Sequence, residues 1–132
     1  MGPSAVNQPT PTDSNTRRVL IIGGGFVGLE CARRLANDSR FEITLIDRNN
    51  HHLFQPLLYQ VATASLAAPD IARSLRQILA KARNVTVLMD QIETLSADQC
   101  TATGQSGQVY SYDHLILATG VRTSFFGHPE WE

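Results

Sequence analysis

Short apolar segments alternate with segments of helical spacing along this chain, which is the pattern of an alternating α/β protein. Residues 18–22 and 114–120 are almost continuously apolar, and this is typical of strands covered on both faces, as in a parallel sheet. Residues 41–47 alternate and are rich in β-branched side chains, and residues 84–90 resemble them. These four segments are predicted to be strands.

Two of the segments between the strands are predicted to be helices. The first covers 26–37, with one apolar stripe facing the sheet. The stripe comprises Val27, Cys31 and Leu35. The second covers 69–83, where Pro69 suits the first helical position and Asp70 suits the positive end of the helix dipole. The connection over 48–68 is long and irregular, and such loops are often functional.

A small antiparallel meander is predicted before the last strand. Gly104 and Gly107 bracket a hairpin turn in this region. The three short strands are expected at 91–95, 100–104 and 108–112. The order of elements predicts a Rossmann-like, doubly wound α/β fold, a parallel sheet with an antiparallel β-meander insert.

Composition limits the chain to one domain and excludes several classes of function. Its 132 residues suit a single domain over 17–132, preceded by a disordered, Pro- and Ser-rich tail over 1–16. A net charge of −1 without a basic block gives no indication of nucleic-acid binding. Cys31 and Cys100 lie far apart, which argues against a disulfide scaffold, a paired-thiol centre and a zinc site and fits a reducing, cytosolic compartment.

Membrane insertion is not expected from the sequence. No apolar run approaches the roughly 18 residues of a membrane-spanning helix, and the polar beginning lacks the apolar core of a signal peptide. The start "MGPSAV" resembles a myristoylation site, but Val6 stands where Ser or Thr is required, so no lipid anchor is expected.

Three glycines follow the first strand with the spacing G-x-G-x-x-G. Gly23 is expected to permit the tight turn, Gly25 to let a diphosphate approach the backbone, and Gly28 to let the helix pack closely on the strand. The N–H groups at the start of the helix would then face the anion. Gly24 is expected only to add flexibility.

Asp47 completes this dinucleotide-binding pattern. It stands at the end of the second predicted strand, about 20 residues after Gly28, where a carboxylate accepts hydrogen bonds from the ribose hydroxyls of an adenosine. A carboxylate at this position disfavours a 2′-phosphate, because like charges would meet. The motif predicts a dinucleotide but does not separate FAD from NAD.

A resemblance favours FAD. The segment "YDHLILATG" at 112–120 resembles the strand and ATG turn of the two-dinucleotide flavoproteins, the glutathione-reductase-like superfamily. In that superfamily the first Rossmann unit binds FAD, a β-meander follows, and the ATG turn passes near the flavin. Plain NAD dehydrogenases lack this late element.

A narrower resemblance lies in 44–66, "TLIDRNNHHLFQPLLYQVATASL", and in 123–132, "TSFFGHPEWE". Both look like the type II, non-proton-pumping NADH dehydrogenases. This resemblance implies a flavoenzyme that passes a hydride from NADH to FAD and electrons to a quinone. It also implies a homodimer held peripherally on the cytoplasmic side of the plasma membrane.

The same resemblance implies a set of FAD-binding residues. Arg48 would lie beside the adenosine half, and Ile92 would meet the adenine through its backbone. Pro56 would approach the flavin ring, while Thr119 and Gly120 would sit beside the diphosphate or the flavin. The complete set is Gly23, Gly25, Phe26, Gly28, Asp47, Arg48, Pro56, Ile92, Thr119 and Gly120. No catalytic residue and no metal ligand is assigned.

The chain departs from the type II pattern in its extent. It shows no second G-x-G-x-x-G domain for NADH, no later segment completing the FAD domain and no C-terminal amphipathic helices for the membrane. We therefore expect the N-terminal part of such an enzyme, an incomplete FAD domain. The alternatives are another flavoprotein of the superfamily, similar to apoptosis-inducing factor or ferredoxin reductases, and an inactive fragment acting only as a binding module.

Two features of the long connection are interpreted more plainly. His51 and His52 are adjacent, so their side chains diverge in an extended segment, and a surface-loop pair is favoured over a position near the flavin and over a shared metal ion. A group of apolar side chains is compatible both with a flavin pocket and with an ordinary core. This group comprises Phe54, Leu57, Leu58 and Tyr59.

Overall fold

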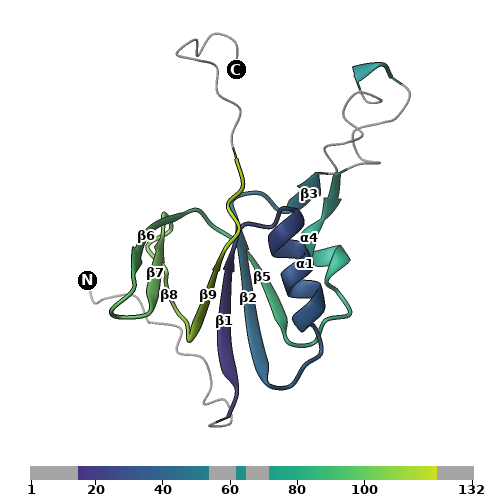
Figure 1. Cartoon of the computed structure of the whole chain (residues 1–132). Helices are drawn as coiled ribbons and strands as arrows, with labels where there is room; N and C mark the ends of the chain where they lie inside the picture. The colour runs from purple at the N-terminus through teal and green to yellow at the C-terminus, as the bar shows by residue number, and fades with distance from the viewer. Residues whose placement is uncertain (1–14, 54–61, 65–71, 122–132) are drawn as a thin grey trace, which may run out of the picture.

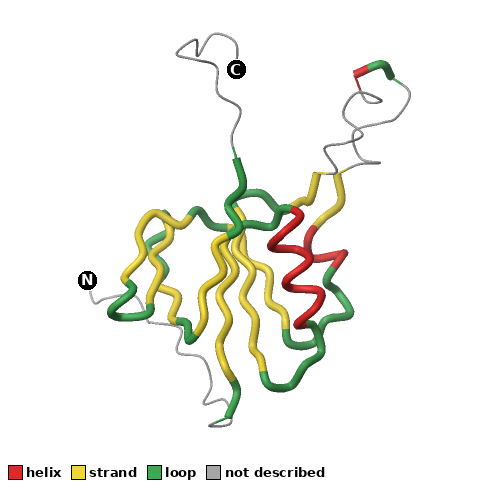
Figure 2. Tube along the Cα trace, viewed as in Figure 1, coloured by secondary structure: helices red, strands yellow, loops and turns green. Residues whose placement is uncertain are grey.

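The computed structural model describes residues 15–53, 62–64 and 72–121. Within them, a parallel sheet lies between an antiparallel meander on one side and helices α1 and α4 on the other (Figure 1). Figure 2 shows both helices on the same side of the sheet. This three-layer arrangement confirms the predicted fold class of a parallel α/β sheet with an antiparallel insert.

The parallel sheet contains β1 (Arg17–Ile22), β2 (Phe41–Asp47), β5 (Val85–Met89) and β9 (His114–Leu117). Their order is β5-β2-β1-β9, and all neighbouring pairs are parallel. The order turns back at β1, which is the strand arrangement of a doubly wound nucleotide-binding fold. Ligands in such folds bind beyond the carboxyl ends of the strands at this reversal.

Two cores form because neighbouring side chains of a strand point to opposite faces of the sheet. On the helix side, Val19 and Ile21 pack with the helix residues Leu29 and Ala32. On the meander side, the buried residues are Leu20, Ile22, Ile46, Ala102 and Tyr112. Continuous apolarity in β1 therefore indicated its burial on both faces correctly.

Helix α1 (Phe26–Leu35) differs from its prediction in its buried face and its end. Of the predicted stripe, Cys31 and Leu35 pack against the helix-side core, but Val27 is 63% exposed, and the buried helix residues are Gly28, Leu29 and Ala32. The face is set by Gly28, whose missing Cβ allows the helix to touch the Gly23 carbonyl. The helix ends at Leu35 because Ala36 is extended and Asn37 takes a φ of 61°.

The predicted helix over 69–83 is largely wrong in its described part. Ala72–Ser74 form β4, which pairs antiparallel with β3 (His51–Leu53), and α4 covers only Leu75–Ile78. Leu75 and Leu79 are buried, but cross-strand pairing with β3 overrides the helical preference of the residues before them. Residues 69–71 lie outside the described residues.

The meander confirms its prediction closely. It consists of β6 (Ile92–Ser96), β7 (Thr101–Gly104) and β8 (Val109–Ser111), paired antiparallel in that order. The Gly107 N–H donates to the Gly104 carbonyl (2.9 Å) in the predicted hairpin turn. The Asp90 carboxylate fastens this turn to the end of β5, since it accepts from Ser106 Oγ (2.5 Å) and the Tyr110 hydroxyl (2.7 Å).

β9 is the edge strand on one side of the sheet. At its start, Asp113 Oδ2 accepts from the Arg18 backbone N–H (2.7 Å), and its other oxygen meets the Arg18 guanidinium (3.1 Å). Leu117 on this strand is 59% exposed. No described helix is long and apolar enough to cross a membrane.

Candidate dinucleotide-binding site

The glycine turn, Asp47 and the end of β9 meet at one edge of the sheet. β1 ends at Ile22 and α1 begins at Phe26, so the turn lies directly beyond the carboxyl end of β1. The Gly23 N–H donates to the Ile46 carbonyl (2.8 Å) and the Ala118 N–H donates to the Ile22 carbonyl (2.8 Å). Figure 1 shows these strand ends converging where α1 starts. Binding crevices of doubly wound sheets lie at this position.

Gly23 and Gly28 are required by the backbone itself. Gly23 has a φ of +106°, and a Cβ there would overlap the Ala118 carbonyl oxygen. A Cβ on Gly28 would overlap the Gly23 carbonyl oxygen. The tight turn and the close approach of helix to strand are therefore present where the motif predicted them.

Gly25 differs from the other two, because the protein does not need its missing side chain. Its φ of −72° suits any L-residue, and a Cβ there would meet nothing within 4 Å. Gly25 is exposed at the beginning of α1. The fold therefore leaves open space beside its backbone, as expected where a ligand approaches.

Gly24 does more than the flexibility that was expected. It is buried, and its N–H donates to Asp47 Oδ2 (2.6 Å). A Cβ on Gly24 would come within 2.5 Å of Leu75 Cδ1 and 3.3 Å of Asp47 Oδ2. A side chain at Gly24 would displace Leu75 and crowd the Asp47 carboxylate, so packing requires a glycine at 23 and at 24, whereas no contact among the described residues requires one at 25.

Asp47 is half-buried and rigidly held. Besides the bond from Gly24, its other oxygen accepts from the Asn49 N–H (2.7 Å). A carboxylate oxygen accepts more than one hydrogen bond, so each oxygen keeps capacity for a further donor. The carboxylate is thus fixed next to the glycine turn with acceptor capacity to spare, which suits recognition of neighbouring hydroxyl groups.

His52 lies beside the glycine turn, so its interpretation as a surface-loop histidine is wrong. Its side chain is half-buried, and Nδ1 lies 3.2 Å from the Gly24 carbonyl oxygen. Its ring meets the Phe26 ring edge-on, with centroids 5.0 Å apart and planes at 86°. Sequence spacing gave no signal for this contact, because it depends on where β3 is placed.

The remaining predicted site residues are spread along the same edge. Arg48 is exposed just beyond β2, and Phe26 is 48% exposed at the start of α1. Thr119 and Gly120 are exposed after β9, with a φ of 67° at Gly120. Ile92 begins β6 and packs partly against the meander core. Pro56 lies outside the described residues, as do Phe54, Leu57, Leu58 and Tyr59.

The described part of the chain contains no group of three His, Cys, Asp or Glu side chains that could hold a metal ion. What the site offers is a strained glycine turn, exposed backbone at the beginning of a helix and one fixed carboxylate. Such an arrangement is suited to a phosphate-linked ligand.

Comparison with known proteins agrees with this geometry. Residues 17–131 match the family model described as pyridine nucleotide-disulphide oxidoreductase. The chain belongs to this family. The predicted resemblance to the two-dinucleotide flavoproteins is therefore confirmed.

Relatives in this family include two from Mycobacterium tuberculosis. Type II NADH:quinone oxidoreductase Ndh is 43% identical over 131 residues, covering 97% of this chain and 28% of the relative. Type II NADH:quinone oxidoreductase NdhA is 44% identical over 117 residues, covering 86% and 25%. The chain thus spans about a quarter of the length of these relatives. The resemblance to type II enzymes therefore concerns about a quarter of the length of these relatives.

Solved structures show the same fold. The sulfide:quinone oxidoreductase of Aquifex aeolicus is 32% identical with a TM-score of 0.77, over 83% of this chain and 26% of that one. Plasmodium falciparum NDH2, solved with NADH, is 21% identical with a TM-score of 0.73, over 85% and 24%. At 21% identity, the similarity to Plasmodium falciparum NDH2 supports the fold alone.

Proposed function

We propose that this chain is the FAD-binding N-terminal part of an NADH:quinone oxidoreductase. One observation carries the proposal: the Asp47 carboxylate is fixed beside an open Gly25 at the strand reversal of the sheet. The 43% identity to a type II NADH:quinone oxidoreductase supports this reading over other oxidoreductases. The domain would cover 17–132, with 1–16 as its tail.

The residues present fit FAD. The exposed backbone at Gly25 and the start of α1 would hold the diphosphate, with Gly23 and Gly28 shaping the turn. Asp47 would accept hydrogen bonds from the ribose hydroxyls, beside Arg48 on the adenosine side. The other proposed contacts are Phe26, Pro56, Ile92, Thr119 and Gly120.

FAD, when bound, would supply the redox chemistry between NADH and a quinone. This chain's residues contribute binding and orientation of the cofactor. NADH and the quinone would be bound by the complete protein. Homodimerisation and a peripheral position on the cytoplasmic side of the plasma membrane belong to the same proposal and rest on the resemblance.

A second candidate keeps the cofactor and changes the electron acceptor. Putidaredoxin reductase, solved in a covalent complex with putidaredoxin, is 28% identical over 82% of this chain with a TM-score of 0.67. The acceptor is decided by the complete protein that contains this chain. Quinone-dependent NADH oxidation by that protein supports the first candidate, whereas NADH-dependent reduction of an iron–sulfur protein without quinone reduction favours the second.

FAD binding itself is tested by titrating the chain and its Gly25→Ala variant with FAD, following flavin fluorescence. The fold tolerates a Cβ at Gly25, so the variant should unfold like the wild type yet bind FAD at least tenfold more weakly. Ala80→Val, at an exposed position, is the control that should bind normally. A folded chain that binds NAD but not FAD would contradict the proposal.

A further inference from the structure

The glycine turn is oriented by two side chains from other elements. The first, Asp47, faces the N–H of Gly24 (2.6 Å). The second, His52 on β3, faces the carbonyl of Gly24 through Nδ1 (3.2 Å). These two groups belong to successive peptide units, one on each side of the Gly24 Cα. Each of the two peptides in the turn therefore has its own external partner.

Because the peptide bond is planar, a contact at one end of a peptide unit also fixes the direction of the group at its other end. In a trans peptide the carbonyl and the N–H point to opposite sides, and no described peptide bond is cis. The N–H of Gly24 faces Asp47, so the carbonyl of Gly23 points the other way, toward Gly28, where a Cβ would overlap it. The first peptide is thus held at both ends.

The same reasoning applies to the second peptide. Its carbonyl is that of Gly24 and its N–H is that of Gly25. Because the carbonyl faces His52, the Gly25 N–H points away from His52. Gly25 is exposed, and among the described residues its N–H has no hydrogen-bond acceptor. This donor is therefore available to a ligand on the open side of the turn.

The His52 ring is suited to this task. A carbonyl oxygen only accepts, so Nδ1 must carry the hydrogen, which fixes the tautomer of the neutral ring. The edge-on contact with Phe26 (5.0 Å between centroids) holds the ring plane. β3 is in turn paired with β4, where Arg73 lies opposite His52. The β3–β4 ladder thereby supports the turn from outside the glycine motif.

We propose that His52 is a positioning residue for the cofactor diphosphate, because its bond to the Gly24 carbonyl aims the Gly25 N–H at the ligand. This inference rests on the proposed function, since the diphosphate is that of FAD. It adds to the glycine motif a residue 28 positions away from Gly24.

The test compares four variants of the chain in FAD titrations. His52→Phe keeps a ring against Phe26 but loses the donor, and His52→Ala loses both. Asn places its amide nitrogen where Nδ1 stands, so His52→Asn should restore the donor. We expect binding to weaken about tenfold in the Phe and Ala variants, the factor for losing one hydrogen bond, and by less than threefold in the Asn variant. His114→Phe, at an exposed position at the start of β9, is the matched control and should bind like the wild type.

A second measurement does not depend on FAD. Long-range proton–nitrogen NMR of the free chain should show the hydrogen of His52 on Nδ1. The Gly25 amide signal should shift in His52→Phe and return toward its wild-type position in His52→Asn. If the wild type binds FAD and all His52 variants bind equally well, the inference is wrong while the proposed function stands. If the wild type does not bind FAD, the proposed function fails. Independently of FAD binding, a hydrogen on Nε2 of His52 instead of Nδ1, or a Gly25 amide signal that does not shift in His52→Phe, would overturn the inference.

Discussion

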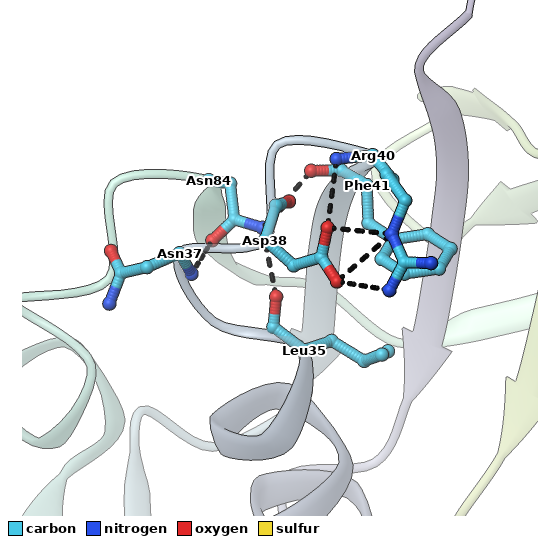
Figure 3. A network of polar contacts seen from close by, with 6 residues as sticks. All are labelled: Leu35, Asn37, Asp38, Arg40, Phe41 and Asn84. Atoms are coloured by element: carbon cyan, nitrogen blue, oxygen red, sulfur yellow. Dashed lines mark hydrogen bonds and ion pairs between the residues drawn. The ribbon is translucent and has the colours of Figure 1, made fainter.

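Replacement of Asn84 should destabilise the fold more than its position in a surface turn indicates. Its side-chain nitrogen lies 3.0 Å from each of three carbonyl oxygens, those of Leu35, Asp38 and Phe41. Its Oδ1 accepts from the Asn37 N–H (2.6 Å). Figure 3 shows this amide between the end of α1 and the start of β2. The Asn84 side chain therefore caps the C-terminal end of α1 and connects it to the start of β2. It also holds the residue before β5 in place.

The magnitude follows from counting donors. An amide has two N–H groups, so three carbonyls at 3.0 Å share them, and with Oδ1 the side chain makes about three hydrogen bonds. At about 1 kcal/mol each, and with the site only partly buried, Asn84→Ala should lower the free energy of unfolding by about 2–3 kcal/mol. Asn84→Asp keeps the acceptor for Asn37 but turns an oxygen toward three carbonyls, so it should destabilise at least as much at pH 7.

The assay is urea unfolding of the chain followed by circular dichroism, with Asn15→Ala as a control at an exposed position before β1. The midpoint should fall in both Asn84 variants with the slope unchanged, and the control should match the wild type. A change below about 0.5 kcal/mol in Asn84→Ala would refute the reasoning, because surface substitutions without special contacts have effects of that size.

Three further predictions concern the turn, the meander and the edge strand. Gly28→Ala should lower the free energy of unfolding by at least about 3 kcal/mol or prevent folding, because its Cβ overlaps the Gly23 carbonyl. Thermal unfolding measures this loss, with Gly25→Ala as the comparison variant. Burial, and after it the bond to Asp90, raises the pKa of Tyr110 to about 12. Stability from this group is complete below about pH 10, the ordinary tyrosine pKa, and is lost as the pH rises toward 12, so Tyr110→Phe should abolish that loss in alkaline unfolding curves. The hydrogen bond from the Arg18 side chain lowers the pKa of Asp113. The Asp113 carboxylate therefore stabilises the fold fully above about pH 4, and this stabilisation is lost as the pH falls through the lowered pKa. Asp113→Asn should therefore lower the free energy of unfolding by about 1 kcal/mol at pH 7, because an exposed ion pair contributes little more than this. At pH 2 the same substitution should have a smaller effect. An equal effect at the two pH values would contradict the ion-pair explanation.

The sequence pattern predicted those parts of the fold that local periodicity decides. The strand over 41–47 has the predicted bounds, because its alternation is read directly from neighbouring residues. The position of Asp47 at the edge of the sheet was predictable for the same reason, since the end of a strand defines that edge. Gly23 and Gly28 were found because their spacing reflects a backbone requirement that only glycine meets.

The parts that were missed depend on contacts between distant segments. His52 and Gly24 are 28 positions apart, and Asn84 reaches Leu35 across 49 positions. No periodicity connects such residues, because their meeting depends on strand order and on the pairing of β3 with β4. That pairing also replaced the start of the predicted second helix, whose local composition favoured a helix.

The most direct test of the account is an amide NMR spectrum of the chain during addition of FAD. The account predicts that the largest shifts fall on the glycine turn at 23–25, on the first residues of α1 and on Asp47 and Asn49. The turn at 97–100, at the opposite end of the meander strands from the hairpin bound by Asp90, should hardly move. Shifts centred on the meander, or none at FAD concentrations that saturate related flavoproteins, would contradict the claim that this edge of the sheet is the cofactor site.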